Sequence, residues 1–398
     1  MERVGRRRWR RLACGDGLEA GTCGETLVNG SRRVVHLTSA HPSDDVRIFT
    51  KECRTLAAAG YEVHLIAPGS EDGMHDGVRT HGLGARAGRD RFARMTSTVS
   101  AVHRRARALA ADLYHFHDPE LMPAGLRLAR SGAAVVYDSH EDLAATVLDK
   151  AWIHHRLRRP TARLVAKLEP AAANRLAAVV AATPVIAERF ARCRCRVITV
   201  NNFPELREFQ RVQRRSSLSE PAVCYVGAIT PIRGIEVMVD AIAHTDARLL
   251  LAGSFESAAF GDRVRALPGW SQVEYLGKVD RAGVGEIFER ASAGIVLLKP
   301  TANYLRSHPT KMFEYMSAGL PVIASDFPLW REIVTQAKCG ICIDPTSPAA
   351  LADALSWLVA HPDEARQMGE NGRRAVSTTY NWQREGERLI ALYGTLLR

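Results

Sequence analysis

The 398-residue sequence predicts an α/β fold with two Rossmann-like, doubly wound domains that face a central cleft. Three observations predict it. The length exceeds what one hydrophobic core usually serves, which favours two domains. From Arg33 onward, short apolar or β-branched runs alternate with amphipathic stretches, as in parallel sheets covered by helices. A polar segment without apolar periodicity, residues 204–221, interrupts this alternation near mid-chain.

The alternation and its interruption divide the chain into five parts. Residues 1–30 are basic and carry no packing pattern, so we expect a disordered extension. Residues 31–203 and 222–380 are each expected to fold as a Rossmann-like domain, with residues 204–221 as the linker. Residues 381–398 are predicted to form a C-terminal helix, which could pack back on the N-terminal domain.

The strand predictions rest on short apolar runs, each separated from the next by helical sequence. In the N-terminal half these runs are Val34–Leu37, Glu62–Ala67, Leu113–His117, Val135–Asp138, Val179–Ala182 and Val197–Asn201. In the C-terminal half they are Val223–Val226, Arg248–Ala252, Val273–Leu276, Gly294–Leu298, Pro321–Ala324 and Ile341–Ile343. Ligands of open parallel sheets bind beyond the carboxyl ends of the strands, so the residues after these runs are candidates for a site.

The composition is that of a soluble globular protein, with 46% hydrophobic and 24% charged residues. No run approaches the roughly 18 apolar residues of a membrane-spanning helix, and no apolar stretch follows the basic start as in a secretory signal. The eight cysteines are scattered, and the pair Cys339 and Cys342 lacks the further ligands of a zinc site. We therefore expect a cytoplasmic protein with unpaired, structural cysteines.

The net charge of +11 is concentrated in clusters at residues 6–11, 103–107 and 154–159. Such clusters can be no more than solvated helix faces. Because two of them fall in the same predicted domain, they also fit a peripheral contact with an anionic membrane or an anionic lipid-linked acceptor. Nucleic acid is not expected as a partner, since no aromatic residues interleave with the arginines and no binding motif accompanies them.

The most informative stretch is His308–Gly319. Its second residue, a proline, suits the first turn of a helix, and its final glycine suits the end. Helical spacing puts Thr310, Lys311 and Glu314 on one face. Free amides at the helix start, together with Lys311, make an anion site, and Glu314 could accept both hydroxyls of a ribose. The alternative is a surface Lys–Glu pair of the common i,i+3 kind.

Glycine turns at three strand ends accompany this helix. Gly227 follows the first strand of the C-terminal half and precedes Arg233, whose planar fork suits a diphosphate. The pairs Gly253–Ser254 and Gly277–Lys278 follow the next two strands. A glycine at such a position lets a ligand approach the backbone closely. Three such turns beside a basic helix start are typical of a nucleotide-diphosphate site.

Polar residues also follow three strands of the N-terminal half. They occupy the segments His41–Arg47, Tyr114–Glu120 and Tyr137–Asp142. A zinc site is one interpretation, because His and Asp recur, but the spacing matches no standard ligand set. Strand-end polar groups satisfied within the protein are another.

These motifs resemble those of retaining glycosyltransferases of family GT4 (group 1), which have the GT-B fold. The C-terminal half carries Tyr-Val-Gly227, Arg233-Gly234, Leu-Ala-Gly253-Ser, Leu-Gly277-Lys-Val, Pro-Thr-Lys311-Met-Phe-Glu314-Tyr-Met and Pro-Val-Ile-Ala-Ser-Asp326. The resemblance covers nearly all of residues 31–395. It implies that the N-terminal domain binds the acceptor and that the C-terminal domain binds a nucleotide-sugar donor.

The resemblance also implies roles for single residues. Glu314 would bind the donor ribose, Arg233 and Lys311 would neutralise the diphosphate, and the backbone at Lys278 and Val279 would read the base. The further donor-binding residues it implies are Gly227, Gly253, Ser254 and Thr310.

On the acceptor and sugar side, the implied residues are Asp45, Arg47, His117, Asp118, His140 and Glu141. His117 is the candidate for the residue beside the reacting anomeric carbon. The predicted catalytic residues are therefore His117, Arg233 and Lys311.

Two positions depart from the family pattern. Arg306 stands where an EX7E motif would place an acid, and Ala228 stands where an arginine usually follows the first glycine. Sugar-binding roles for residues 303–307 are therefore not transferred.

The expected reaction is transfer of a sugar, from a UDP-sugar as the commonest family donor, with retention of configuration. The acceptor would be a saccharide or a lipid-linked saccharide of a cell-surface polysaccharide, glycolipid or glycoconjugate. No cofactor and no metal is expected, because no DxD-type motif stands at a strand end and cationic residues can neutralise the leaving diphosphate. Two alternatives are an epimerase of nucleotide sugars with the same fold and a non-catalytic protein that binds anions or nucleic acid. The sequence does not specify the oligomeric state.

Overall fold

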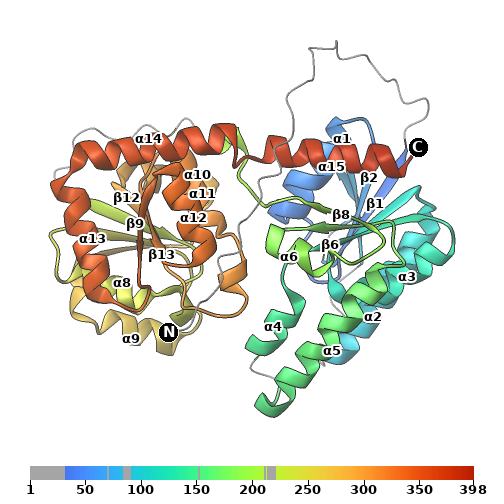
Figure 1. Ribbon diagram of the computed structural model, residues 1–398, viewed down its shortest axis with the longest axis horizontal. Coiled ribbons are helices and arrows are strands. Elements are labelled where there is room, and N and C mark those ends of the chain that lie inside the picture. Colours follow the sequence, from blue (N-terminus) through green and yellow to red (C-terminus); the bar gives the residue numbers. More distant parts are fainter. Residues whose placement is uncertain (1–31, 70, 84–90, 151–152, 210–211, 213–220) are drawn as a thin grey trace, which may run out of the picture. The chain divides into compact units, whose positions relative to one another are not determined.

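The computed structural model describes residues 32–398 except residues 70, 84–90, 151–152, 210–211 and 213–220 (Figure 1). The predicted extension, residues 1–30, lies outside the described residues. So does more than half of the predicted linker, residues 204–221.

The first sheet has eight strands in the order β3-β4-β2-β1-β5-β6-β7-β8. Their bounds are β1 Arg33–Leu37, β2 Glu62–Ala67, β3 Gly73–His75, β4 Val78–Gly82, β5 Leu113–Phe116, β6 Ala134–Ser139, β7 Ala178–Ala181 and β8 Arg196–Thr199. Every neighbouring pair is parallel except β3 with β4. The six strands predicted from apolar runs are present within two residues of their predicted ends. The sequence analysis missed β3 and β4, because Met74 and His75 are exposed and neither strand is an apolar run.

The second sheet has six parallel strands in the order β11-β10-β9-β12-β13-β14. Their bounds are β9 Ala222–Val226, β10 Arg248–Ala252, β11 Val273–Gly277, β12 Ala293–Val296, β13 Val322–Ser325 and β14 Gly340–Ile343. All correspond to predicted strands. The two sheets thus confirm the predicted α/β architecture of two doubly wound, parallel sheets.

Helices connect the strands and cover both faces of each sheet (Figure 1). In the N-terminal half they are the π-helical segment η1 Val46–Cys53, α1 Arg54–Ala58, α2 Arg91–Leu109, η2 Pro119–Leu121, α3 Met122–Arg130, α4 Leu143–Asp149, α5 His155–Ala173, α6 Pro184–Arg189 and α7 Leu206–Phe209. In the C-terminal half they are η3 Pro231–Arg233, α8 Ile235–Ile242, α9 Ala258–Arg265, η4 Pro268–Gln272, α10 Arg281–Arg290, η5 Tyr304–Arg306, α11 Thr310–Ala318, α12 Pro328–Ala337, α13 Pro348–Ala360, α14 Pro362–Thr378 and α15 Trp382–Leu396.

Each sheet carries an apolar core on both of its faces. On β1, Val35 and Leu37 belong to one core cluster and Val34 to the other, because successive strand residues point to opposite faces. This two-sided burial explains why the strands read as continuous apolar runs rather than alternating ones.

The last helix, α15, packs on the first sheet. Leu389, Leu392 and Tyr393 belong to the same core cluster as Val34 (Figure 1). The indole of Trp382 donates a hydrogen bond to the Thr55 hydroxyl at 2.8 Å. The C-terminal helix is therefore part of the core that includes residues of β1 and β5.

Gly253 is one position where the fold requires glycine. Its φ is +144°, and a Cβ atom there would lie 1.8 Å from the carbonyl oxygen of Gly227. We predict that Gly253→Ala lowers the free energy of unfolding by at least about 2 kcal/mol, because a backbone oxygen must move. Denaturant unfolding followed by circular dichroism measures this change.

Gly285→Ala is the matched control. Gly285 lies within α10, and a Cβ atom there would meet nothing within 4 Å. This substitution should raise stability by up to about 1 kcal/mol, since alanine favours helices over glycine. Equal effects of the two substitutions would contradict the steric argument.

Candidate active site

Backbone hydrogen bonds hold together the turns that follow β9 and β10. The Gly227 amide donates to the Ala252 carbonyl at 2.9 Å, and the Ile229 amide donates to the Ser254 carbonyl at 3.0 Å. The glycines predicted to line a donor site therefore lie on neighbouring strand ends.

The turn after β11 joins the same group. The Gly253 amide donates to the Gly277 carbonyl at 2.7 Å, and Lys278 and Val279 follow directly. Gly277 has φ +65°, a left-handed conformation that favours glycine. The structure thus brings together the three glycine turns that the sequence singled out.

Helix α11 packs against the end of β9 through Tyr315. The Val226 amide donates to the Tyr315 hydroxyl at 3.3 Å, and Gly294 leaves room for the Tyr315 ring, which a Cβ atom would approach to 2.3 Å. The helix ends at Gly319 with φ +75°, as predicted. Pro309 is not in the first turn, however. Its ψ of 109° is extended, so it occupies the N-cap position and the helix begins at Thr310.

Glu314 is a buried carboxylate between two cations. It is 5% exposed, and it accepts hydrogen bonds from Lys311 Nζ at 2.8 Å and from Arg281 Nη1 at 3.1 Å. Burial raises the pKa of this carboxyl, but Lys311 and Arg281 outweigh burial and hold the pKa below its usual value. The Lys311–Glu314 contact is therefore not the solvated surface pair that the sequence left open.

Arg281 is a contact of this site that the sequence analysis missed. It is the first residue of α10, four positions after Gly277. A basic residue at a helix start next to a glycine turn is a signal that could have identified it.

Arg233 lies at the end of η3, beside the turn at Gly227. Burial raises the pKa of the Tyr225 hydroxyl to about 12, and the nearby Arg233 opposes that shift. A Cβ atom on Gly227 would lie 3.2 Å from the same hydroxyl. The cation predicted to meet a diphosphate therefore lies at the same strand end as the first glycine turn.

In the N-terminal half, Asp138 is the centre of a buried ionic network. Arg47 holds its carboxylate with two hydrogen bonds, at 3.1 Å from Nε and 2.9 Å from Nη2. His140 Nε2 lies 2.9 Å and His117 Nδ1 3.2 Å from Asp138 Oδ2. The sequence analysis missed Asp138 as a site residue, although its position at a strand end before His140 was a signal.

The two histidines of this network differ in exposure. His117 is 1% exposed, and its Nε2 lies 2.9 Å from His36 Nδ1, so both of its ring nitrogens are engaged. Burial lowers the pKa of His117 and outweighs the opposing effect of Asp138. The side chain of His140 is 18% exposed. The role of His117 beside an anomeric carbon stays a prediction.

The predicted carboxylates of this half lie in different surroundings. Asp45 caps η1 and accepts hydrogen bonds from the Arg47 and Ile48 amides. Asp118 is buried and accepts from the Thr38 hydroxyl at 2.7 Å. Asp118 also accepts from the Ser39 amide and forms an ion pair with His41.

Glu141 is exposed and accepts from the Thr146 hydroxyl at 3.0 Å. Arg306, which stands where the family pattern has an acid, forms an ion pair with Asp142 at 2.8 Å.

Two groups of side chains in the described part of the chain could hold a metal ion. The first is His36, Glu52, His115 and His117, and the second is His117, Asp138 and His140. Neither His36 nor Glu52 was a candidate from the sequence.

Comparison with known proteins identifies the family. A family model described as Glycosyltransferase Family 4 matches residues 47–204, and one described as Glycosyl transferases group 1 matches residues 207–375. The chain belongs to family 4 of the glycosyltransferases. The resemblance seen in the sequence is thereby confirmed, and the enzyme is a glycosyltransferase.

Curated relatives are distant but consistent with this family. A GDP-mannose-dependent alpha-mannosyltransferase of Mycolicibacterium smegmatis is 26% identical over 370 residues, covering 86% of this chain and 91% of the relative. The D-rhamnosyltransferase WbpZ of Pseudomonas aeruginosa is 26% identical over 166 residues, which cover 41% of this chain and only 42% of WbpZ.

Solved structures share the fold. Sucrose-phosphate synthase from Thermosynechococcus elongatus superposes with a TM-score of 0.73 at 21% identity, covering 92% of this chain and 99% of that one. HepE of Anabaena, solved in complex with UDP and glucose, has a TM-score of 0.69 at 12% identity, with 92% and 100% covered. These likenesses confirm the GT-B fold. Within the described residues, no helix has both the length and the apolar character needed to cross a membrane.

The ion pair of His41 with Asp118 predicts a pH dependence. His41 Nδ1 lies 2.9 Å from Asp118 Oδ1, and this contact raises the pKa of His41 above its usual value of 6.5. A raised folded-state pKa contributes stability that is fully present below pH 6.5 and is lost as the pH rises through the folded pKa. Denaturant unfolding at a series of pH values should show this loss in the wild type.

His41→Gln should remove that part of the pH dependence. His361→Gln is the control, because the ring of His361 contacts a backbone carbonyl rather than a carboxylate. The difference between the two variants cancels the contributions of the other histidines. An identical pH dependence in both variants would contradict the assignment.

Proposed function

We propose that this glycosyltransferase transfers a sugar from a nucleotide-diphosphate donor, with a UDP-sugar as first candidate, and that it retains the anomeric configuration. The acceptor is a saccharide or a lipid-linked saccharide used to build a cell-surface polysaccharide, glycolipid or glycoconjugate. The observation that carries the proposal is the ionised Glu314, held between Lys311 and Arg281 beside three glycine turns.

Glu314 suits a ribose because its two oxygens can accept from two neighbouring hydroxyls. A carboxylate that binds hydroxyls must stay ionised, and the pKa of Glu314 is held low although the side chain is buried. Lys311 and Arg281 each occupy one of its oxygens, so they also fix the direction in which the carboxylate points.

The donor diphosphate would meet Lys311, Arg233 and the start of α11. Positive charge and helix amides stabilise the charge that develops as a diphosphate leaves. The glycine turns at Gly227 and Gly253 let the phosphates approach the backbone. We therefore propose that no metal ion is needed at the diphosphate.

On the sugar side, the network around Asp138 offers His140 at its exposed edge. In this proposal the acceptor hydroxyl attacks the anomeric carbon directly, on the face that the diphosphate leaves, so no side chain acts as a nucleophile. The leaving phosphate accepts the proton of that hydroxyl. An epimerase is not favoured, because the family and the relatives reported above are transferases.

The donor assignment is tested with the purified protein and a set of UDP- and GDP-sugars. A donor that binds the native state raises the melting temperature, and transfer releases the nucleoside diphosphate in an acceptor-dependent manner. Glu314→Gln should weaken donor binding by about 10- to 100-fold, the effect of a lost charged hydrogen bond of roughly 1.5–3 kcal/mol.

Glu332→Gln, an exposed substitution on α12, is the matched control and should bind the donor as the wild type does. Unchanged donor affinity in Glu314→Gln would refute the ribose role. Isomerised nucleotide sugar without released diphosphate would identify an epimerase instead.

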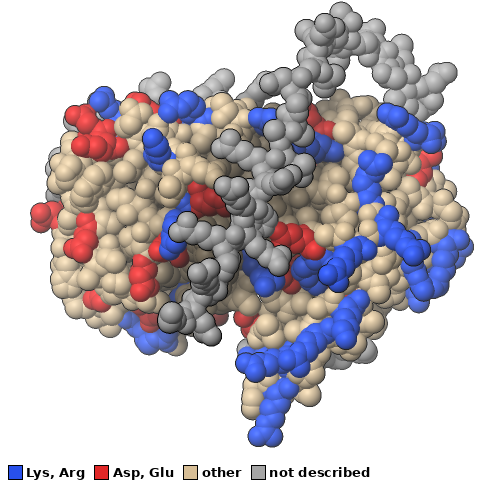
Figure 2. Space-filling model, viewed as in Figure 1, with Lys and Arg blue, Asp and Glu red and all other residues tan. Residues whose placement is uncertain are grey.

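We also propose that the enzyme is cytoplasmic and works at the cytoplasmic face of an anionic membrane through α5. Leu157, Leu164 and Leu168 are 55–58% exposed on this helix. At 100° per residue the three leucines form one stripe, and Arg163 and Lys167 lie beside it. Figure 2 shows basic side chains over the region where Figure 1 draws α5. An apolar stripe next to basic residues is typical of a helix that lies in a lipid surface.

Sedimentation with vesicles that contain phosphatidylserine tests this proposal. Each basic residue near such a surface contributes about 1 kcal/mol, so Arg163→Gln with Lys167→Gln should weaken binding by about thirtyfold. Arg366→Gln with Arg374→Gln removes the same charge from exposed positions of α14 and should change binding little. Equal losses in both double variants, or no binding by the wild type, would disprove the docking role of α5.

A further inference from the structure

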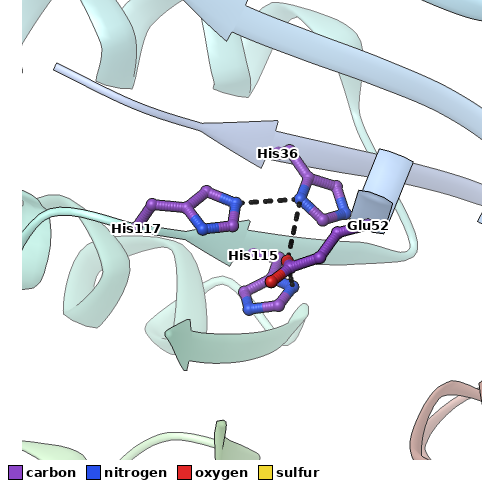
Figure 3. A group of neighbouring side chains, drawn as sticks. All are labelled: His36, Glu52, His115 and His117. Carbon is purple, nitrogen blue, oxygen red and sulfur yellow. Dashed lines mark hydrogen bonds and ion pairs between the residues drawn. The ribbon is translucent and has the colours of Figure 1, made fainter. Parts of the chain in front are cut away.

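Three histidines and a glutamate meet in the core of the N-terminal half. His36 lies on β1 directly opposite His115 on β5, and His117 follows two residues later on the same face. Glu52 reaches this point from η1, which covers that face of the sheet. Figure 3 shows the four side chains pointing toward one another. Of the four, only His117 was a candidate from the sequence for a place beside the reacting carbon.

These side chains are fully buried, and several of their polar atoms have no hydrogen bond. Within the described residues, neither oxygen of Glu52 nor Nε2 of His115 has a hydrogen-bond partner. Arg47 Nε lies 3.1 Å from a Glu52 oxygen, but it donates its hydrogen bond to Asp138. A buried carboxylate whose cationic neighbour is shared with Asp138 is costly, and a metal ion would give Glu52 a partner of its own.

The spacing of the four side chains fits a metal ion. One potential ligand atom from each residue lies within 4.8 Å of all the others. His36 Nδ1 is 2.9 Å from His117 Nε2 and 4.0 Å from Glu52 Oε2. Ligands bound to zinc at 2.0–2.1 Å in a tetrahedron lie about 3.3 Å apart, a value between these distances.

Residues outside the cluster form hydrogen-bond contacts with ring nitrogens of the three histidines, as is common for histidines that bind a metal. The other ring nitrogen of His117 lies 3.2 Å from Asp138. The Tyr393 hydroxyl lies 3.1 Å from His36 Nε2 and 2.9 Å from His115 Nδ1. For His36 and His117, such contacts fix the tautomer and orientation of a ring that binds a metal through its remaining nitrogen. His115 contacts Tyr393 through Nδ1, which also lies 3.9 Å from Glu52 Oε2, so its Nε2, unpartnered among the described residues, is the nitrogen left for a metal.

We propose that His36, Glu52, His115 and His117 bind one divalent transition-metal ion, with zinc the first candidate. Imidazole and carboxylate ligands suit this ion, and four protein ligands in a fully buried position make a closed, structural site. The ion ties β1, β5 and η1 together and fixes the ring of His117. It binds no substrate, so the proposed metal-free departure of the diphosphate is unaffected.

The second group, His117, Asp138 and His140, suits a metal less well. Its only carboxylate is already held by two hydrogen bonds from Arg47, whose positive charge opposes a cation at the same oxygen. Because the two groups share His117, variants of the other members distinguish them.

The test is the metal content of the full-length protein, purified without chelators and measured by plasma mass spectrometry. We expect about one zinc ion per wild-type chain. Glu52→Gln and His115→Gln should each lower this content at least tenfold, whereas His140→Gln should keep it. His81→Gln is a matched control that should also keep it, because it disrupts another buried histidine pair, His64 and His81, whose rings lie 2.8 Å apart at their nearest nitrogens.

A second measurement uses only the wild type, so it holds even if a variant does not fold. After chelator treatment, added zinc should raise the melting temperature, and added cobalt should give the visible absorption of a tetrahedral site. A wild type without bound metal and without either response would overturn the proposal. So would metal that is lost in His140→Gln but kept in His115→Gln. No assay contains a nucleotide sugar, so this outcome is independent of the donor proposal.

Discussion

The ion pair of Arg47 with Asp138 is the interaction on which the N-terminal half of the site depends. Both side chains are buried, and the pair has the two-bond geometry that best offsets the cost of taking charges out of water. Asp138 then positions His117 and His140, while Arg47 also donates to the Val200 carbonyl. Removing either partner would leave the other buried charge without its two-bond partner, a loss of about 3–5 kcal/mol.

The C-terminal half uses the same arrangement around Glu314. A buried carboxylate again lies near the end of a parallel sheet, and basic side chains, here Lys311 and Arg281, again hold it ionised. The two halves differ in how exposed the basic side chains are. The side chains of Lys311 and Arg281 are 24% and 45% exposed, whereas that of Arg47 is 6% exposed. The cations of the donor half are therefore open to a ligand, and Arg47 serves the protein itself.

What could be predicted from the sequence was local along the chain. Apolar runs gave the strands because both sheet faces are covered, and the glycines gave the turns because each turn depends on its own backbone. The convergence of His36 with His115 could not be predicted this way. It follows from β1 lying next to β5 in register, although 79 positions separate the two residues. Glu52 was missed for a related reason, since it meets the histidines only through the packing of η1 on the sheet. Arg281 did have a local signal, its place at a helix start just after the turn at Gly277.

In both halves, a buried charged group fixes the position of a more exposed group that could contact a ligand. In each half, a carboxylate inside the protein fixes a partner at its edge: Lys311 and Arg281 for Glu314, and His140 for Asp138. The buried member cannot reorganise when a ligand arrives, so the exposed member keeps its direction. Electrostatic stabilisation of a reacting group depends on such fixed partners more than on their number. The burial of Glu314 and Asp138 is thus what keeps the more exposed Lys311, Arg281 and His140 in fixed positions for a ligand.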